Sequence, residues 1–382
     1  MKIVISVHTY WPQKNGVQYV TQYLAEGLAK RGHEVVIITC SSDKKEIGSV
    51  LHNGVKVITA FLKTKYSMLN IGKRNVIYTL SKEIENADVL INCCVQSPIN
   101  NIILSKLNKV SCPKILYMHG MHDFAGKSDA KENIKYYLWH CFMNVRWGLF
   151  YLLNKNKFAL YDLMIDIYEN SGSFSFFKKL GVRVPHCVIH NAVEEFTQRV
   201  NPEADFLDEK YFLCVANYND RKNQKGLVKA YEHIKSKNGY KLVMIGARSN
   251  YSDELKEYIK SNNLEQDVLL IEDLDRSKTK NYIAKCYCAI LASKYEVYPI
   301  FLCESIACGH PYISTNVGCV KDIPGGIIVE SENGLTDAMQ NAINSPEEMI
   351  ELGKIGYRYA QDELTQNEKV KQLENEIIKI VK

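Results

Sequence analysis

The chain has 382 residues, of which 46% are hydrophobic and 24% are charged, and its formal net charge at pH 7 is +5. This length and composition fit a globular protein of about two domains and exclude a disordered or fibrous chain. No apolar run approaches the roughly 20 residues that a membrane-spanning helix needs. Because a strand-like run begins at Lys2, we also expect no signal peptide.

Charge is divided unevenly along the chain. Residues 1–190 contain 24 Lys and Arg against 13 Asp and Glu, whereas the remaining residues contain 24 against 30. A basic N-terminal half suggests an anionic partner, such as an acidic glycan or a membrane surface. We expect no nucleic-acid partner, because the sequence has no recognised basic motif or zinc finger.

The 12 cysteines include no Cys-x-x-Cys pair, and several lie in or beside strand-like runs. This usage predicts reduced, mostly buried thiols in a cytoplasmic protein rather than disulfides or a zinc site.

Short apolar runs alternate with helical stretches along the first half of the chain, which is the pattern of a parallel sheet. Strands are expected at residues 2–7, 34–40, 55–61, 88–93, 114–118 and 162–167. The first helix has Val17, Val20, Leu24 and Leu28 on one face and should end at Gly32.

Between the fifth and sixth of these strands lies the segment 136–157, which mixes aromatic and basic residues. That mixture is typical of a helix lying in the plane of a membrane surface. An amphipathic helix packed on the sheet explains it equally well.

A second α/β set follows the polar stretch 193–208. Its strands are expected at residues 211–216, 241–245, 268–271, 287–292 and 312–315. The sequence therefore predicts an α/β protein of two Rossmann-like domains, with the boundary in that polar stretch.

Two glutamates eight positions apart, Glu296 and Glu304, form the most informative pattern in the chain. A buried strand should precede them, and Pro299 suits the first turn of a helix that Gly309 ends. Glu296 is then expected in a loop at the carboxyl end of a strand, where open α/β sheets bind ligands, with Glu304 on the helix behind it. The free amides of residues 297–300 would attract a phosphate.

This stretch resembles the E-x7-E signature of retaining glycosyltransferases of the two-domain GT-B type, above all family 4 (glycosyltransferase group 1), which uses nucleotide-sugar donors. The matching residues are Ser293, Glu296, Pro299, Glu304, Ala307, Gly309 and Pro311. Val297, Ser305 and Ile306 replace the usual glycine, alanine and methionine. The spacing and the strand-turn-helix context both agree with the motif.

The resemblance implies a GT-B fold, in which two Rossmann-like, doubly wound domains face each other across a cleft. We expect residues 1–195 to form the acceptor-binding N-terminal domain and residues 196–363 the nucleotide-sugar-binding domain. Residues 364–382 should form a helix that crosses back to the N-terminal domain.

Two places in the first half match the family. Gly16 lies where the family has a glycine-rich loop that touches the donor diphosphate or the acceptor, and a glycine lets the backbone approach a ligand closely. A tight connection explains a single glycine equally well. His119-Gly120 resembles the His-Gly pair that projects toward the transferred sugar, where an imidazole can bond a hydroxyl or a developing charge. His122 is a second histidine close by.

Residues 212–224 resemble the phosphate loop of the second domain. Lys222 takes the lysine position and would contact the leaving diphosphate, whose negative charge grows in the transition state. Asn217 occupies the position of the usual arginine, for which Arg221 is a possible replacement. A solvated basic turn would give the same sequence.

Asp273-Leu274-Asp275 has the Asp-x-Asp form that holds a metal in a different transferase fold. Here it follows the strand 268–271 and precedes a helix, where Asp is an ordinary cap. We interpret it as a helix cap beside the nucleotide base, and we expect no metal and no cofactor other than the nucleotide-sugar co-substrate.

The roles implied by the resemblance are donor binding and catalysis. Glu296 would hold hydroxyls of the donor sugar, Glu304 the ribose hydroxyls, and His119 the transferred sugar. The donor-binding residues are Gly16, Asn217, Arg221, Lys222, Ser293, Val297, Tyr298, Pro299, Ile300 and Glu304, and the catalytic residues are Glu296 and His119. Retention proceeds either through a carboxylate nucleophile, as in retaining glycosidases, or by the same-face route generally favoured in this family.

The sequence thus predicts a cytoplasmic, retaining, metal-independent glycosyltransferase. It would move a hexose or N-acetylhexosamine to a hydroxyl of a glycan acceptor, with a UDP-sugar as the favoured donor and GDP-mannose second. The basic half and the family together indicate a lipid-linked acceptor in cell-surface polysaccharide synthesis, with peripheral contact at the inner face of the membrane. A non-catalytic GT-B subunit that binds a partner or glycan is the alternative.

Overall fold

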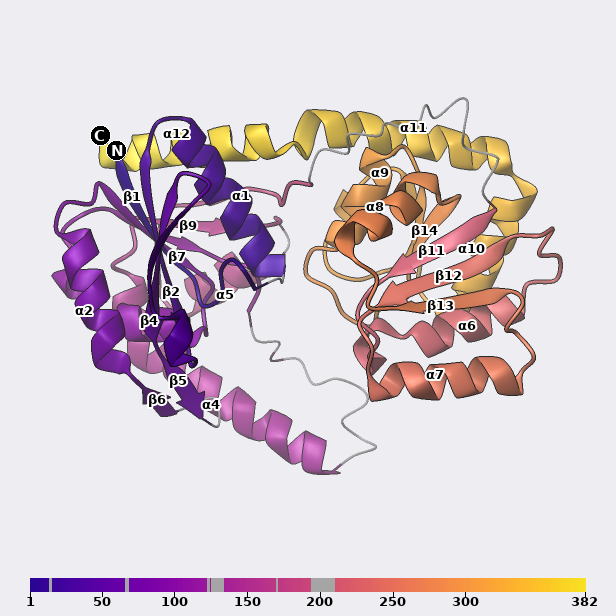
Figure 1. The fold of residues 1–382 in the computed structure, drawn as a ribbon, viewed down its shortest axis with the longest axis horizontal. Coiled ribbons are helices and arrows are strands. Elements are labelled where there is room, and N and C mark those ends of the chain that lie inside the picture. Colours follow the sequence, from indigo (N-terminus) through magenta and orange to yellow (C-terminus); the bar gives the residue numbers. More distant parts are fainter. Residues whose placement is uncertain (14–15, 66–68, 122–123, 125–133, 170, 194–209) are drawn as a thin grey trace. The chain divides into compact units, whose positions relative to one another are not determined.

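The computed structural model describes residues 1–13, 16–65, 69–121, 124, 134–169, 171–193 and 210–382. The chain forms two compact units (Figure 1). Unit 1 comprises residues 1–190 and 369–382, and unit 2 comprises residues 191–368. The chain passes from one unit to the other after residue 190 and again after residue 368. The sequence analysis placed the corresponding domain limits at residues 195 and 363.

Unit 1 is built on an eight-stranded sheet in the order β10-β9-β8-β7-β1-β2-β4-β3. The strands are β1 (Lys2–Ser6), β2 (Glu34–Ser41), β3 (Gly48–His52), β4 (Val55–Phe61), β7 (Val89–Cys93), β8 (Lys114–Tyr117), β9 (Leu163–Asp166) and β10 (His186–Val188). Every neighbouring pair is parallel except β3 with β4. The order of the parallel strands reverses between β1 and β7, as in a Rossmann fold.

Helices cover both faces of this sheet, so its central strands β1, β2 and β7 are buried over most of their length. The helices are α1 (Gly16–Lys30), α2 (Lys73–Ile84), α3 (Pro98–Leu104), α4 (Ile134–Phe158) and α5 (Ser173–Lys179), and a small ribbon pairs β5 (Lys63–Lys65) with β6 (Leu69–Ile71). Helix α1 ends as predicted, with Gly32 at φ +88°.

The last helix, α12 (Gln366–Val381), packs on unit 1 over most of its length. Its Glu374 accepts hydrogen bonds from Arg31 Nε and His33 Nε2, both at 2.7 Å. The C-terminal segment therefore returns to the unit in which the chain began.

Unit 2 contains a six-stranded, fully parallel sheet in the order β13-β12-β11-β14-β15-β16. The strands are β11 (Tyr211–Val215), β12 (Lys241–Gly246), β13 (Val268–Glu272), β14 (Cys288–Leu291), β15 (Tyr312–Thr315) and β16 (Gly326–Val329). The helices are α6 (Gln224–Glu232), α7 (Asn250–Ser261), α8 (Arg276–Lys285), α9 (Ile300–Ala307), α10 (Glu332–Asn344) and α11 (Pro346–Glu363). Numbered along the chain, this is the 3-2-1-4-5-6 order of a Rossmann fold, which confirms the predicted fold class.

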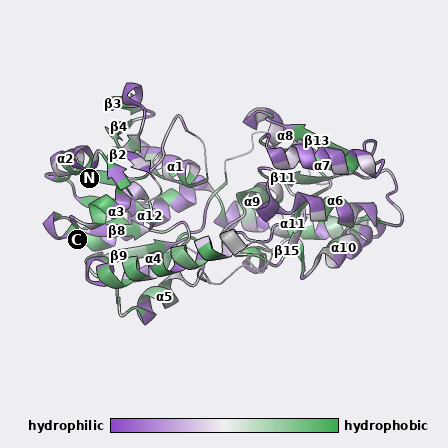
Figure 2. Ribbon diagram, turned by 90° about the horizontal axis from the view of Figure 1, so that it is seen from below, coloured by the Kyte–Doolittle hydropathy of each residue, from purple (hydrophilic) through white to green (hydrophobic). Residues whose placement is uncertain are grey.

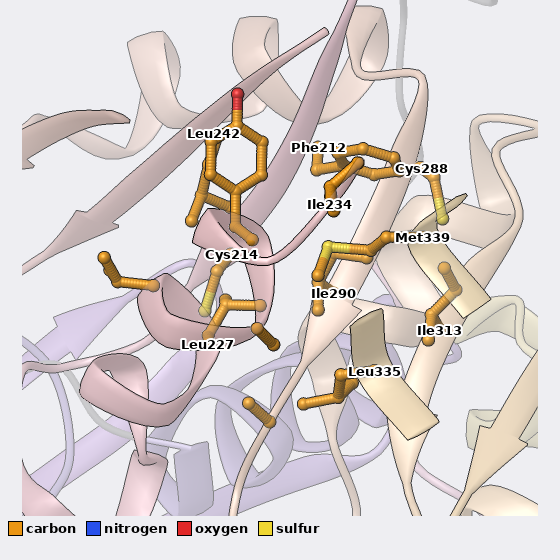
Figure 3. Close-up of a cluster of buried hydrophobic side chains, with 14 of the residues drawn as sticks. Phe212, Cys214, Leu227, Ile234, Leu242, Cys288, Ile290, Ile313, Leu335 and Met339 are labelled. Carbon is orange, nitrogen blue, oxygen red and sulfur yellow. The ribbon is translucent and has the colours of Figure 1, made fainter. Parts of the chain in front are cut away.

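The core of unit 2 fixes β11 against β14. Figure 3 shows Phe212 and Cys214 of β11 beside Cys288 and Ile290 of β14, with Leu227 of α6 in the same cluster. These side chains are at most 2% exposed. All twelve cysteines are free, as predicted, and most of them are buried. Within the described ranges, no helix combines the length and apolarity that crossing a bilayer requires.

Helices α9 and α11 approach each other closely through glycines of α11. A Cβ atom on Gly353 would lie 2.2 Å from the carbonyl oxygen of Gly309, and one on Gly356 would lie 2.8 Å from Cγ2 of Ile306. Since the carbonyl belongs to the backbone that ends α9, it has little freedom to move aside. Gly353 therefore sets the position of α9 in unit 2.

Replacing Gly353 by alanine tests this contact. Alanine normally stabilises a helix relative to glycine by roughly 0.5–1 kcal/mol, but here we expect a loss of about 1–3 kcal/mol from overpacking. The midpoint of thermal unfolding of unit 2 should fall by about 2–4 °C per kcal/mol. Gly148→Ala in α4 is the matched control, because nothing lies within 4 Å of its Cβ position. Equal behaviour of the two variants would show that the close contact has no energetic weight.

Candidate functional site

The candidate site in unit 2 lies where the strand order reverses, between β11 and β14. Ligands of open α/β sheets bind outside the carboxyl ends of the strands at such a point. Residues 216–223 follow β11 and residues 292–299 follow β14. The two loops are joined, since Lys294 N donates to Arg221 O at 2.8 Å and Lys294 Nζ lies 3.0 Å from Asp220 Oδ1.

Glu296 is the centre of the polar cluster formed by these loops. Its Oε1 accepts a hydrogen bond from Ser293 Oγ at 2.9 Å and forms an ion pair with Lys222 Nζ. The Lys222 and Glu296 side chains are only 17% and 12% exposed, so the pair is shielded from bulk water. The structure thus brings Lys222, from one sequence pattern, to Ser293 and Glu296, from another.

Local turn chemistry positions Lys222. Residues Asp220–Lys222 form a single 3₁₀ turn, and Asn219 caps it by accepting from Lys222 N at 3.2 Å. Asn223 follows with φ +53°, a left-handed conformation that asparagine tolerates. This tight turn aims Lys222 at the neighbouring loop.

Two residues that the sequence analysis missed, at the end of β15 and just after it, contact the Glu296 loop. Thr315 Oγ1 donates to Ser293 O at 2.7 Å. Gly318 has φ +55°, and a Cβ there would lie 2.6 Å from Val297 O and 2.7 Å from Glu296 O. The loop therefore rests directly on the backbone after β15. A glycine shortly after a predicted strand was the available signal for this contact.

The helix that carries Glu304 begins later than predicted. Pro299 is the N-cap of α9 rather than part of its first turn, and Val297 and Tyr298 precede the helix. Because proline has no N–H, Pro299 contributes no amide to the anion-binding stretch expected at residues 297–300. Leu302 N already donates to Pro299 O at 3.1 Å. The amides of Ile300 and Phe301 are thus the two at this helix start that the described contacts leave open.

Glu304 is buried to 2% exposure and is held by Arg276, the first residue of α8. The guanidinium binds both carboxylate oxygens: Nη2 pairs with Oε1, and Nη1 donates to Oε2 at 3.2 Å. Two-point binding of this kind fixes both the charge and the plane of a carboxylate. The sequence analysis did not find Arg276, because the residue lies 28 positions before its partner.

Asn217 and Arg221 do not join the cluster. Both are exposed, and among the described contacts neither side chain is bonded to Ser293, Glu296 or Glu304. Asn217 contributes its carbonyl, which accepts from Gln224 Nε2 at 3.1 Å. In the described contacts, Lys222 pairs with Glu296 and Arg276 pairs with Glu304.

In unit 1, His119 lies two residues beyond β8 and stacks on Tyr117 with ring centroids 5.0 Å apart. Burial lowers the pKa of His119 to about 4, so the imidazole is neutral at pH 7. Its Nε2 is enclosed and has no hydrogen-bond partner among the described residues. A buried polar atom left unsatisfied costs free energy unless a water or ligand reaches it. His122 lies outside the described residues.

Gly16 is the first residue of α1 and is exposed. No atom lies within 4 Å of the position that a Cβ would take. Packing within the protein therefore does not require glycine at this position.

The Asp-x-Asp triplet is used within the protein. Asp275 caps α8, with Oδ1 accepting from Lys278 N at 3.0 Å, and Asp273 Oδ1 accepts from Arg248 N at 3.0 Å. Among the residues that the structure describes, no three His, Cys, Asp or Glu side chains are grouped so that they could hold a metal ion.

Comparison with known proteins gives one family match in each half of the chain. Residues 14–157 match the model of Glycosyltransferase Family 4, and residues 196–359 match that of Glycosyl transferases group 1. A 152-residue stretch is 32% identical to the N-acetylgalactosamine-N,N'-diacetylbacillosaminyl-diphospho-undecaprenol 4-alpha-N-acetylgalactosaminyltransferase of Campylobacter jejuni. That match spans 38% of this chain and 40% of the relative.

Solved structures match over nearly the whole chain. Sucrose-phosphate synthase from Thermosynechococcus elongatus has a TM-score of 0.73 at 17% identity, covering 99% of this chain and 98% of its own. Anabaena HepE in complex with UDP has a TM-score of 0.75 at 13% identity, covering 99% and 100%. These similarities show the same fold.

Fold and family matches together define the class of this protein as a glycosyltransferase with the GT-B fold. Within that class the chain belongs to the group 1, family 4-like glycosyltransferases, as the Glu296–Glu304 spacing indicated.

Removing Arg276 should lower the free energy of unfolding, because the buried carboxylate of Glu304 would lose its cationic partner. Breaking a buried ion pair costs roughly 3–5 kcal/mol. Because the Arg276 side chain is 41% exposed, we expect a smaller loss for Arg276→Ala, about 2 kcal/mol. The unfolding midpoint of unit 2 should fall by about 2–4 °C per kcal/mol.

Lys278→Ala is the matched control, since Lys278 lies in the same helix and its pair with Asp275 is at the surface. It should change stability by less than about 1 kcal/mol. Equal losses from both substitutions, measured by thermal unfolding without ligand, would contradict a stabilising role for the Arg276–Glu304 pair.

Proposed function

We propose that this glycosyltransferase transfers a hexose or N-acetylhexosamine, with retention of anomeric configuration, from a nucleotide-sugar to a hydroxyl of a lipid-linked glycan. A UDP-sugar is the favoured donor and GDP-mannose the second choice. The reaction needs no metal ion and no further cofactor. It serves cell-surface polysaccharide synthesis at the cytoplasmic face of a membrane.

The observation that carries this proposal is the shielded Lys222–Glu296 pair at the strand-order reversal of unit 2. A diphosphate that enters this crevice offers Lys222 a second anionic partner. Glu296 can then accept hydrogen bonds from hydroxyls of the donor sugar, while Ser293 keeps its carboxylate in place. The two charges are thus suited to two adjacent parts of one nucleotide-sugar, the diphosphate and the sugar.

Lys222 acts on the leaving group in this proposal. As the bond between the sugar and the diphosphate breaks, negative charge grows on the phosphate oxygens, and a fixed ammonium group stabilises that charge. The amides of Ile300 and Phe301 add partial positive charge at the start of α9. Neither contribution requires a metal ion.

Glu304 holds the ribose of the donor. Each oxygen of a carboxylate has two lone pairs, so one bond to Arg276 does not by itself exhaust its capacity to accept hydrogen bonds. Vicinal hydroxyls can donate to these oxygens while the guanidinium keeps the carboxylate oriented. Arg276 is therefore a positioning residue for nucleotide binding. The sequence analysis did not propose such a role for any residue.

His119 serves the transferred sugar from unit 1. Because its pKa is about 4, the ring is neutral and its enclosed Nε2 can exchange a hydrogen bond with a hydroxyl. A neutral imidazole also avoids repelling the positive charge that develops on the sugar ring. Gly16, whose Cβ position is open, would allow a ligand to approach the start of α1.

The relatives support the choice of donor and acceptor. The name of the C. jejuni enzyme specifies a diphospho-undecaprenol acceptor and transfer of N-acetylgalactosamine. HepE has been solved with UDP and with UDP-glucose. An undecaprenol chain is a membrane lipid, which agrees with the basic N-terminal half of this chain.

Donor binding is tested by thermal unfolding with UDP, GDP, ADP, CMP and their sugars. A ligand at 100 times its Kd stabilises the folded state by about 2.7 kcal/mol. We expect selective stabilisation by UDP and UDP-sugars, and loss of most of it in Lys222→Ala. Lys321→Ala, at an exposed position in unit 2, should retain it. No stabilisation of a cooperatively folding sample by millimolar nucleotide would favour the non-catalytic alternative.

The role of Glu296 is tested by Glu296→Gln. The amide keeps the shape but loses the charge that orients the donor sugar, and misplacement of reacting groups costs about 100-fold in rate. Product formation from UDP-sugar should fall by about that factor while stabilisation by UDP persists. Glu330→Gln is the control, since Glu330 is exposed and bonded to Asn316 in the same unit. An unchanged rate for Glu296→Gln would refute the assigned role.

A further inference from the structure

Helix α4 of unit 1 exposes an apolar stripe to solvent. The residues of this outer stripe are Leu138, Phe142, Val145, Leu149, Leu152 and Leu153, each between 45% and 77% exposed. Their spacing of three and four residues places them on one side of the helix. Figure 2 shows α4 as largely hydrophobic along its length. A contiguous exposed patch of this kind marks an interaction site in most proteins.

The opposite side of α4 is already used for packing. Trp147, Tyr151 and Phe158 are at most 7% exposed and belong to the core of unit 1. Tyr151 packs edge to face on Phe176 and Phe177, with ring centroids 4.9 and 5.8 Å apart. This inner face accounts for the attachment of α4 to the sheet. None of the outer-stripe residues belongs to that core.

The charges of α4 have a single sign. Its sequence contains four basic residues, Lys135, Arg146, Lys155 and Lys157, and no Asp or Glu. Trp139 and Tyr137, near its N-terminal end, are 53% and 50% exposed. Apolar side chains on one face, flanking cations and exposed aromatic residues are the features of a helix that lies in a bilayer interface.

We propose that the outer stripe of α4 docks on the surface of an anionic lipid bilayer, with the helix lying in the membrane plane. The proposal rests on the proposed function, because a lipid-linked acceptor has to be reached at a membrane. It deepens that function by assigning membrane contact to one helix and one set of side chains. The apolar stripe enters the interface, and Lys155 and Lys157 contact anionic head groups.

A second copy of the chain is the competing occupant. The spacing from Leu138 to Leu152 also suits pairing of two helices in a coiled coil. Such pairs are normally flanked by opposite charges, whereas the charged residues of α4 are all basic and its sequence contains no Asp or Glu that a second copy could offer. Charge complementarity therefore selects an anionic lipid surface over a second α4.

Chain connectivity links this helix to the acceptor side of unit 1. Helix α4 lies in the crossover from β8 to β9, and His119 begins that crossover. Phe124, five residues further on, stacks on Phe176 at 5.5 Å, and its carbonyl accepts from Asn144 Nδ2 of α4 at 3.3 Å. A bilayer that binds α4 thus sits at a set position relative to the His119 segment.

The test is flotation of the full-length protein with lipid vesicles. Wild-type protein should bind vesicles of phosphatidylglycerol and phosphatidylcholine, and bind phosphatidylcholine alone more weakly. Val145→Glu/Leu149→Glu/Leu152→Glu should lower binding by about tenfold or more, because charged side chains are costly in the apolar interface. Leu51→Glu/Leu269→Glu/Ile355→Glu is the matched control, with the same charge change at other exposed apolar positions.

The basic residues provide a second, milder variant. Lys155→Gln/Lys157→Gln should reduce affinity for the anionic vesicles by about fivefold per lysine and weaken its dependence on salt. Both positions are at least partly exposed, so the fold should tolerate the change. Unchanged unfolding and unchanged UDP stabilisation verify that each variant is folded.

Two results with the stripe variant would overturn the proposal. One is equal vesicle binding by the stripe variant and wild type. The other is a wild-type dimer in sedimentation that the stripe variant dissociates, without vesicle binding by either. Vesicle binding without any nucleotide stabilisation would contradict the proposed function and leave membrane docking intact. Nucleotide stabilisation without vesicle binding would do the reverse.

Discussion

The carboxylate of Glu296 joins the two loops that form the candidate site. It accepts a hydrogen bond from Ser293 in its own loop and forms an ion pair with Lys222 in the loop after β11. These two loops flank the point where the strand order reverses. At such a reversal the connections leave the sheet on opposite sides, so that a crevice opens between them. Without an opposite charge there, Lys222 and Glu296 would each be a partly buried ion with no partner, which is unfavourable. The pair holds both side chains in place where the two loops meet.

Small residues make the geometry around this carboxylate possible. Gly318 allows the loop of Glu296 to rest on the segment after β15, and Gly353 allows α11 to touch the end of α9. In both cases a Cβ would fall within 2.7 Å of a backbone oxygen. Contacts between backbones therefore set the positions of Glu296 and Glu304. Such contacts can shift less than contacts between side chains. Arg276 then fixes the orientation of Glu304 from a third element.

The sequence predicted the elements whose signals are local. Each of the eleven expected strands is present, because a run of buried apolar residues needs no distant information to be recognised. The missed strands β3, β5, β6, β10 and β16 lie at sheet edges or in the small ribbon, where short length and partial exposure weaken the apolar pattern. The spacing of Glu296 and Glu304 could be recognised from the sequence because both residues lie within one loop and the helix that follows it. The bond from Arg276 to Glu304 was not, since it depends on how α8 and α9 pack. Pro299 was misplaced by one position because proline is accepted both at a helix cap and in the first turn.

The two faces of the unit 1 sheet carry different tasks. Side chains alternate along a strand, and Val4, Val36 and Leu90 point into the cluster that also contains residues of α2, α3, α4 and α5. Ile3, Ile5 and Ile37 are buried but lie outside that cluster, on the face that α1 and the returning α12 cover. Val370 of α12 meets Gly27 of α1 on this second side. The helix that ties the C-terminus to unit 1 and the helix with the outer stripe thus occupy opposite faces. Contact of α4 with a bilayer would therefore not disturb the attachment of α12. The two helices use different faces of the same sheet.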